Sequence, residues 1–170
     1  MVIGIVYIVA YSYITNRARH EKLIRRVDKS EIYLTDQLRE SDFPQLGRLH
    51  IATIVDMRPD GEAADQIPSR QAGDMSKRRG ITFEYVPIPH GDIPSAGVDR
   101  LSSILSNGKR PILLYCRTGS RALRTFCLAD AARKDGHSAD ELHSIAEQLG
   151  FGIKDIQPEI ARRIAARAPK

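Results

Sequence analysis

One stretch of the sequence, residues 111 to 121, constrains the fold more than any other. Ile112 to Tyr115 is a short apolar run without charge, as expected of a strand that is covered on both faces of a sheet. The segment from Cys116 to Arg121 follows at once, and helix-forming residues continue to Lys134. The sequence therefore predicts a buried strand, a tight loop and a helix, with a cysteine where the strand ends.

The chemistry of this junction favours a nucleophilic cysteine. Backbone N–H groups at a helix N-terminus carry partial positive charge, and thiols placed there are deprotonated more readily. Arg117 and Arg121 would act on Cys116 in the same direction. The loop N–H groups and a guanidinium would also hold an oxyanion, or the sulfur of a persulfide. We therefore expect Cys116 to be the nucleophile and Arg121 to be the anion clamp and transition-state stabiliser.

The surroundings of Cys116 are unlike those of a core cysteine. An isolated cysteine at the end of a strand is most often a small buried residue, and Cys127, between Phe126 and Leu128, fits that description. Beside Cys116, however, the sequence places two arginines, a glycine and hydroxyl groups. These residue types favour an anion-binding loop, which we expect to consist of Arg117, Thr118, Gly119 and Ser120.

Two sequence blocks resemble those of a known family. The segment Cys116 to Arg121 resembles the active loop of the beta-lactamase-hydrolase-like, phosphatase-like family, which belongs to the tyrosine and dual-specificity phosphatase-like superfamily. Arg58-Pro59-Asp60-Gly61-Glu62, after an earlier strand, is similar to a signature of that family. Gln37 and Gly150-Phe151-Gly152 are weaker similarities. The resemblance covers about residues 30 to 160 and implies the phosphatase-like α/β fold.

The order of predicted elements gives the same fold class. Strands and helices alternate from residue 31 to residue 135. Such alternation predicts a mainly parallel central sheet with helices on both faces. Residues 81 to 88 alternate between polar and apolar side chains, which suggests an edge strand.

The spacing of the active loop departs from that of the superfamily. Its phosphatases place five residues between cysteine and arginine, whereas four separate Cys116 from Arg121. Tyr115 stands where a histidine usually precedes the cysteine. Four intervening residues are the spacing of rhodanese-type sulfurtransferases, and a tighter loop suits a sulfur atom better than a phosphoryl group. The resemblance therefore implies the fold more directly than it implies phosphatase chemistry.

The resemblance also implies further site residues. In dual-specificity-type enzymes the loop after the edge strand carries an aspartic general acid, and Asp92 matches that position by order along the chain. His90 is a second candidate for this role, and an Asx turn beside Gly91 is the structural alternative. We expect Arg58 and Asp60 to build or brace the pocket rim, although turn chemistry alone also accounts for that block.

Three functions are compatible with these residues. The first is hydrolysis of phosphate esters by a Cys116 thiolate, and the second is sulfur transfer through a Cys116 persulfide. The third is a non-catalytic module that binds anions. We place hydrolysis first and expect a phosphorylated or sulfane-sulfur substrate without a cofactor. The histidines show no metal-ligand spacing, and the net charge of +5 comes without a nucleic-acid motif.

The N-terminal residues suggest an attachment to a membrane. Residues 2 to 15 carry no charge, and basic residues follow at once. A helix of about 14 residues spans about 21 Å, short of the roughly 30 Å hydrocarbon core. We predict a short membrane anchor over residues 1 to 15, a basic linker over 16 to 29 and a catalytic domain over 30 to 170.

The basic flank would hold that domain on the cytoplasmic face of the membrane. The alternatives to the anchor are a mis-assigned start of the chain and a first buried strand. Without an anchor, we expect a cytoplasmic protein, since a working thiol prefers a reducing compartment.

Overall fold

A five-stranded sheet forms the centre of the computed structural model, which describes residues 22 to 167. The strand order is β1-β2-β5-β3-β4, so the strand that precedes the Cys116–Arg121 segment is central. Four strands run parallel, and β1 pairs with β2 in the antiparallel direction. The strands are β1 (Arg25–Arg26), β2 (Ile32–Thr35), β3 (Thr53–Asp56), β4 (Thr82–Tyr85) and β5 (Ile112–Tyr115). The predicted α/β class and the predicted edge position of β4 are confirmed.

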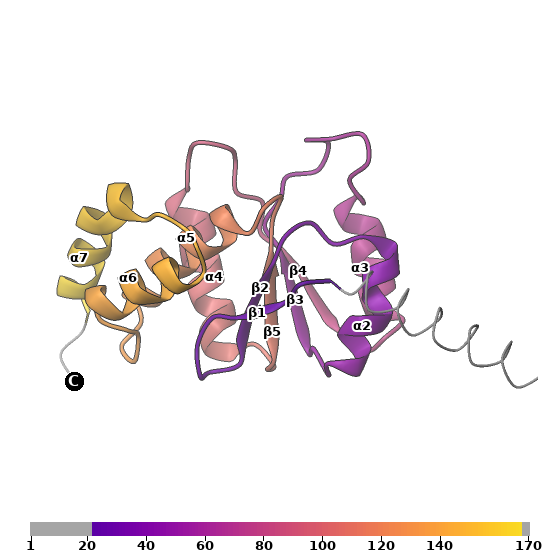
Figure 1. The fold of residues 1–170 in the computed structure, drawn as a ribbon, viewed down its shortest axis with the longest axis horizontal. Coiled ribbons are helices and arrows are strands. Elements are labelled where there is room, and N and C mark those ends of the chain that lie inside the picture. Colours follow the sequence, from indigo (N-terminus) through magenta and orange to yellow (C-terminus); the bar gives the residue numbers. More distant parts are fainter. Residues whose placement is uncertain (1–21, 168–170) are drawn as a thin grey trace, which may run out of the picture.

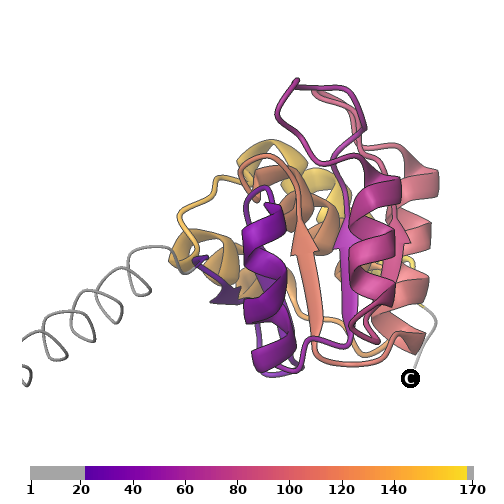
Figure 2. The same cartoon turned by 90° about the vertical axis from the view of Figure 1, so that its right-hand side faces the viewer.

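Helices cover both faces of the sheet (Figures 1 and 2). One face carries the helices α2 and α3, which lie in front of the sheet in Figure 2. The other face carries α4 and α5, and α6 and α7 pack against α5 farther from the sheet (Figure 1). The helices are α2 (Phe43–Arg48), α3 (Ser69–Lys77), α4 (Ser95–Asn107), α5 (Ser120–Ala131), α6 (Ala139–Gln148) and α7 (Gln157–Ala165), with short 3-10 turns η1 (Glu40–Asp42) and η2 (Lys154–Ile156).

The alternation of side chains along β5 divides the core into two clusters. Leu114 belongs to the larger cluster, under α4 and α5, whereas Leu113 belongs to the smaller one, under α2 and α3. All four residues of β5 are buried, as the uncharged run predicts. Cys127 lies in the larger cluster, and burial raises the pKa of its thiol to about 12. It is therefore an inert core residue, as expected.

The segment predicted as a linker is part of the domain wherever the structure describes it. Arg25 and Arg26 pair with Leu34 and Tyr33 of β2, and Val27 is buried. The linker prediction for residues 16 to 29 is therefore wrong over residues 22 to 29, because this segment completes the edge beside β2. The predicted anchor, residues 1 to 15, lies outside the described residues. Within residues 22 to 167, none of the helices has the length and apolar character needed to span a membrane.

A buried carboxyl group ends β3. Asp56 is 1 % exposed, and its Oδ1 accepts the backbone N–H of Arg58 at 3.0 Å. Its Oδ2 has no hydrogen-bond partner. Burial raises the pKa of Asp56 to about 6, against the smaller lowering effects of Tyr115 and of the Arg58 N–H. The folded protein therefore contains a carboxyl group that is costly to ionise.

This cost predicts that Asp56→Asn makes the folded protein more stable at high pH. The substitution keeps the Oδ1 acceptor and removes the charge. The pKa rises from 3.8 to about 6 on folding. Between pH 3.8 and about 6, the folded state therefore binds more protons than the unfolded state. Ionisation of Asp56 then lowers the free energy of unfolding as the pH rises through this range. We expect the stability of the variant relative to wild type to be greater at pH 7.5 than at pH 4, by about 2 kcal/mol. Urea unfolding at both pH values checks this, and a pH-independent difference would contradict it.

Candidate active site

The loop after β5 folds around the sulfur of Cys116. The backbone N–H of Gly119 donates to Sγ at 3.2 Å, and Cys116 is buried at the base of the loop. Gly119 has a φ of 90°, in the left-handed region, and α5 begins at the next residue. A Cβ atom at position 119 would lie 3.3 Å from Cζ of Phe151 and 3.4 Å from the carbonyl oxygen of Thr35. The left-handed turn therefore favours glycine, and the neighbouring atoms leave little room for a side chain.

Arg121 is held beside Cys116 by a carboxylate that the sequence analysis assigned no role. Its Nη1 and Nη2 donate to Oε1 and Oε2 of Glu62 at 2.6 and 2.8 Å, and Nη1 also donates to the carbonyl oxygen of Ile88 at 2.7 Å. Glu62, and less strongly the side chain of Cys116, raise the pKa of Arg121. Arg121 in turn holds the pKa of Glu62 down at about 2. The guanidinium is therefore fixed in place and always charged.

Arg58 binds the same carboxylate and connects it to a third loop. Its Nε donates to Oε2 of Glu62 at 2.9 Å, and its Nη1 donates to Oε1 of Gln37 at 2.9 Å. The backbone N–H of Gln37 donates to the carbonyl oxygen of Arg117 at 3.3 Å. Hydrogen bonds therefore join the segments that follow β2, β3 and β5 around the loop. The sequence signal for Glu62 was an acid four positions after Arg58, within the Arg58–Glu62 block.

Asp60 is engaged with a helix next to the site. Its carboxylate accepts both the backbone N–H and the hydroxyl of Ser69 at 2.7 Å, where α3 begins. Its own backbone N–H donates to the Tyr85 hydroxyl at 2.9 Å. These contacts cap α3 and tie the turn to β4. The structure thus gives Asp60 a bracing position and places no contact between it and the Cys116 loop.

A cavity of about 360 Å³ lies beside Arg121. Its walls come from the loop after β4, from the first turns of α5 and from η2, and consist of Pro89, His90, Gly91, Asp92, Ile93, Ser120, Arg121, Arg124 and Asp155. The structure thus brings both candidate acids to the same cavity as Arg121. Among the residues that the structure describes, none forms a hydrogen bond or ion pair with the carboxylate of Asp92, which is exposed. Arg117 and Thr118 are also exposed.

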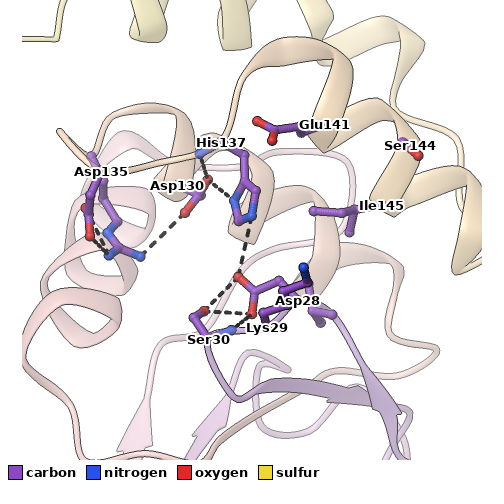
Figure 3. A pocket seen from close by; sticks show the side chains of 11 residues that line it. Asp28, Lys29, Ser30, Asp130, Asp135, His137, Glu141, Ser144 and Ile145 are labelled. Atoms are coloured by element: carbon purple, nitrogen blue, oxygen red, sulfur yellow. Dashed lines mark hydrogen bonds and ion pairs between the residues drawn. The ribbon is translucent and has the colours of Figure 1, made fainter.

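A second cavity, of about 490 Å³, lies between the β1–β2 turn and the start of α6 (Figure 3). Contacts between acidic and basic groups join five of its side chains, which are Asp28, Asp130, Arg133, Asp135 and His137. Nδ1 of His137 is 2.9 Å from Oδ2 of Asp130, and its Nε2 is 3.8 Å from Oδ2 of Asp28. Arg133 bridges Asp130 and Asp135. No cluster of three metal-ligating side chains exists among residues 22 to 167. We therefore assign this cavity a structural role.

Asp130→Ala tests that role. Asp130 is 2 % exposed and accepts the backbone N–H of His137 at 2.7 Å as well as the ring contact. Its removal leaves buried donors without a partner, so we expect a loss of about 3 kcal/mol in the free energy of unfolding. Asp135→Ala is the matched control, because its carboxylate is exposed and should contribute at most about 1 kcal/mol. Urea unfolding measures both, and equal effects would contradict the assignment.

Glu62→Gln tests the clamp on Arg121 without relying on activity. The pKa of Glu62 falls from 4.5 to about 2 on folding, so the clamp stabilises the protein fully above pH 4.5. This contribution is lost as the pH falls towards 2. We expect wild type to be more stable than Glu62→Gln by roughly 2 kcal/mol at pH 7, and the difference to shrink between pH 4.5 and pH 2. A constant difference in thermal or urea unfolding would rule the clamp out.

Comparisons with known proteins place the chain in a family. The family model for the "Beta-lactamase hydrolase-like protein, phosphatase-like domain" matches residues 24–133, which include both the Arg58–Glu62 and the Cys116–Arg121 segments. The beta-lactamase hydrolase-like protein of Xylella fastidiosa (strain 9a5c) is 27 % identical over 133 residues. That match covers 76 % of this chain and 30 % of the relative, so the chain spans less than a third of the curated relative's length.

Solved structures agree with this assignment. A provisionally assigned phosphatase from Neisseria meningitidis has a TM-score of 0.70 and 28 % identity, over 82 % of this chain and 97 % of the other. The core catalytic domain of a PP-IP phosphatase from S. cerevisiae has a TM-score of 0.62 and 22 % identity, over 81 % and 83 %, and shares the fold. The chain therefore belongs to the family of the phosphatase-like domain of beta-lactamase hydrolase-like proteins.

Proposed function

We propose that this chain is a phosphatase-type hydrolase in which Cys116 is the nucleophile and Arg121 binds the phosphoryl group. One observation carries the proposal: a guanidinium fixed by Glu62 lies beside a cysteine whose sulfur accepts the Gly119 N–H at 3.2 Å. Membership of the phosphatase-like family supports phosphate esters as the substrate class. The Neisseria and yeast structures, each described as a phosphatase, support it further.

The first chemical step would transfer the phosphoryl group to the enzyme. The sulfur of Cys116 attacks phosphorus, and the bond between phosphorus and the ester oxygen breaks. Arg121 and the loop N–H groups hold the non-bridging oxygens while charge develops on them. Asp92 donates its proton to the leaving oxygen, which departs as an alcohol.

The second step would restore the enzyme. Water attacks the phosphocysteine, Asp92 accepts the proton, and inorganic phosphate leaves the Cys116 thiolate. The support for Asp92 is its place on the wall of the Arg121 cavity and a carboxylate that no described residue engages. His90 lines the same cavity and is the second candidate.

The loop spacing favours one alternative, sulfur transfer. In that reaction the Cys116 thiolate takes the outer sulfur of thiosulfate and releases sulfite. Cyanide then removes that sulfur from the persulfide as thiocyanate. This route needs no general acid, so Asp92 would have no chemical role in it. The four residues between Cys116 and Arg121 are the observation that supports it.

Parallel assays of the full chain under reducing conditions separate the hypotheses. We expect phosphate release from an aryl phosphate, reduced at least about a thousandfold by Cys116→Ser. We expect Asp92→Asn to reduce it by about 10²- to 10⁴-fold, since a general acid contributes that much. Asp99→Asn, an exposed carboxylate on α4, is the matched control and should leave the rate unchanged.

Three outcomes would count against hydrolysis by Cys116. Thiocyanate formation that depends on Cys116, without phosphate release, would assign the chain to the sulfurtransferases. Phosphate release at an unchanged rate in Cys116→Ser would show that Cys116 is not the nucleophile. Anion binding that Cys116→Ser preserves and Arg121→Ala abolishes, without activity in either assay, would favour the binding module.

The same phosphate assay separates the two candidate acids. If His90→Asn is inactive and Asp92→Asn is active, His90 is the general acid.

A further inference from the structure

A second arginine shares the cavity with Arg121. Arg124 follows it by three positions on α5, and both side chains line the 360 Å³ cavity. Residues three apart on a helix lie on one face, with Cβ atoms about 5–6 Å from each other. The cavity wall therefore carries two arginine side chains from one face of α5. The proposed hydrolysis uses only the first of them.

The two arginines are held in different ways. Glu62, which binds Arg121, is itself fixed by the buried Arg58. Arg124 donates to Asp155 through two contacts, Nη1 to Oδ1 at 2.8 Å and Nη2 to Oδ2 at 2.5 Å, and its Nη1 also donates to the carbonyl oxygen of Gly152 at 3.3 Å. The Asp155 side chain is 69 % exposed, whereas that of Arg124 is 21 % exposed. Arg124 is thus largely enclosed, and its partner is a surface group.

Because of this difference, an anion can displace Asp155 from Arg124. Ion pairs with an exposed partner contribute little, because water screens them and competes for both groups. A phosphate presents the same two-oxygen edge to a guanidinium as a carboxylate does. An anion that enters the cavity can therefore take the place of Asp155 on Arg124. The fixed Glu62 offers no such exchange at Arg121.

We propose that Arg124 forms a second anion subsite, and that the substrate carries another phosphoryl group next to the one that is hydrolysed. Both arginines line one cavity of about 360 Å³, so a small ligand with two phosphoryl groups, such as an organic pyrophosphate or bisphosphate, suits the pair. Arg121 would bind the reacting phosphate and Arg124 its neighbour, with Asp155 displaced into water. This inference rests on the proposed function for the position of the first phosphate.

Binding measurements test the subsite separately from catalysis. We would titrate inorganic pyrophosphate and orthophosphate into Cys116→Ser, which prevents turnover, and into the same protein with Arg124→Gln. We expect the parent to bind pyrophosphate about tenfold more tightly than orthophosphate, since a charge-assisted hydrogen bond supplies at least that factor. Arg124→Gln should abolish this preference and leave the orthophosphate affinity unchanged.

Two further variants sharpen the test. Asp155→Asn should strengthen pyrophosphate binding severalfold, because Arg124 loses its competing partner; it also serves if Arg124→Gln fails to fold. Arg100→Gln is the matched control, since Arg100 lies on α4, pairs with Glu84 and is absent from the cavity wall. Phosphoglycolate, which carries a phosphate and a carboxylate, shows whether the second group must be a phosphate.

The remaining outcomes overturn the subsite. An equal loss of affinity for both anions in Arg124→Gln would mean that Arg124 only shapes the fold. The absence of a preference for pyrophosphate in the parent, or of any anion binding, would also reject it. If Arg124→Gln abolishes a preference for pyrophosphate but the wild type releases no phosphate in the activity assay, the subsite proposal stands and the hydrolase proposal is rejected. If the wild type releases phosphate but pyrophosphate is not preferred, the hydrolase proposal stands and the subsite proposal is rejected.

Discussion

The carboxylate of Glu62 is the contact on which the rest of the site depends. It lies between the guanidiniums of Arg58 and Arg121 and accepts hydrogen bonds from both. Arg58 is 4 % exposed, and a buried cation is costly unless a carboxylate pairs with it. Without Glu62, the guanidiniums of Arg58 and Arg121 would lose the carboxylate that both of them bind. One acidic residue in a turn therefore fixes the position of the Arg121 guanidinium.

Parallel strands explain why distant sequence blocks meet at this carboxylate. Parallel strands that enter from one edge of a sheet all end at the opposite edge. Here Thr35, Asp56 and Tyr115 occupy one register across β2, β3 and β5. The segments that follow them carry Gln37, the Arg58–Glu62 block and Cys116, which hydrogen bonds then connect. The sheet therefore supplies the proximity, and the polar network supplies the orientation.

The two cavities differ in whether their carboxylates already have partners within the protein. Around His137 the carboxylates of Asp28 and Asp130 are buried, and each has partners within the protein. Around Arg121 the carboxylate of Asp92 is exposed and unengaged by any described residue. The carboxylates of the larger cavity thus already have partners within the protein. The smaller one retains groups that can act on a ligand, and its wall includes Ser120 and Arg121 from the end of the Cys116–Arg121 segment.

The sequence by itself determined several local features of the structure. A four-residue apolar run gave β5, a glycine marked the left-handed turn at 119, and the capping box of Ser138 and Glu141 opened α6. These signals depend on neighbours along the chain, so they survive without knowledge of the fold. Tertiary structure alone decided that residues 25–26 join the sheet and that Arg121 pairs with Glu62, 59 positions away. Such pairings depend on which strands lie side by side, and no periodicity in the sequence encodes that choice.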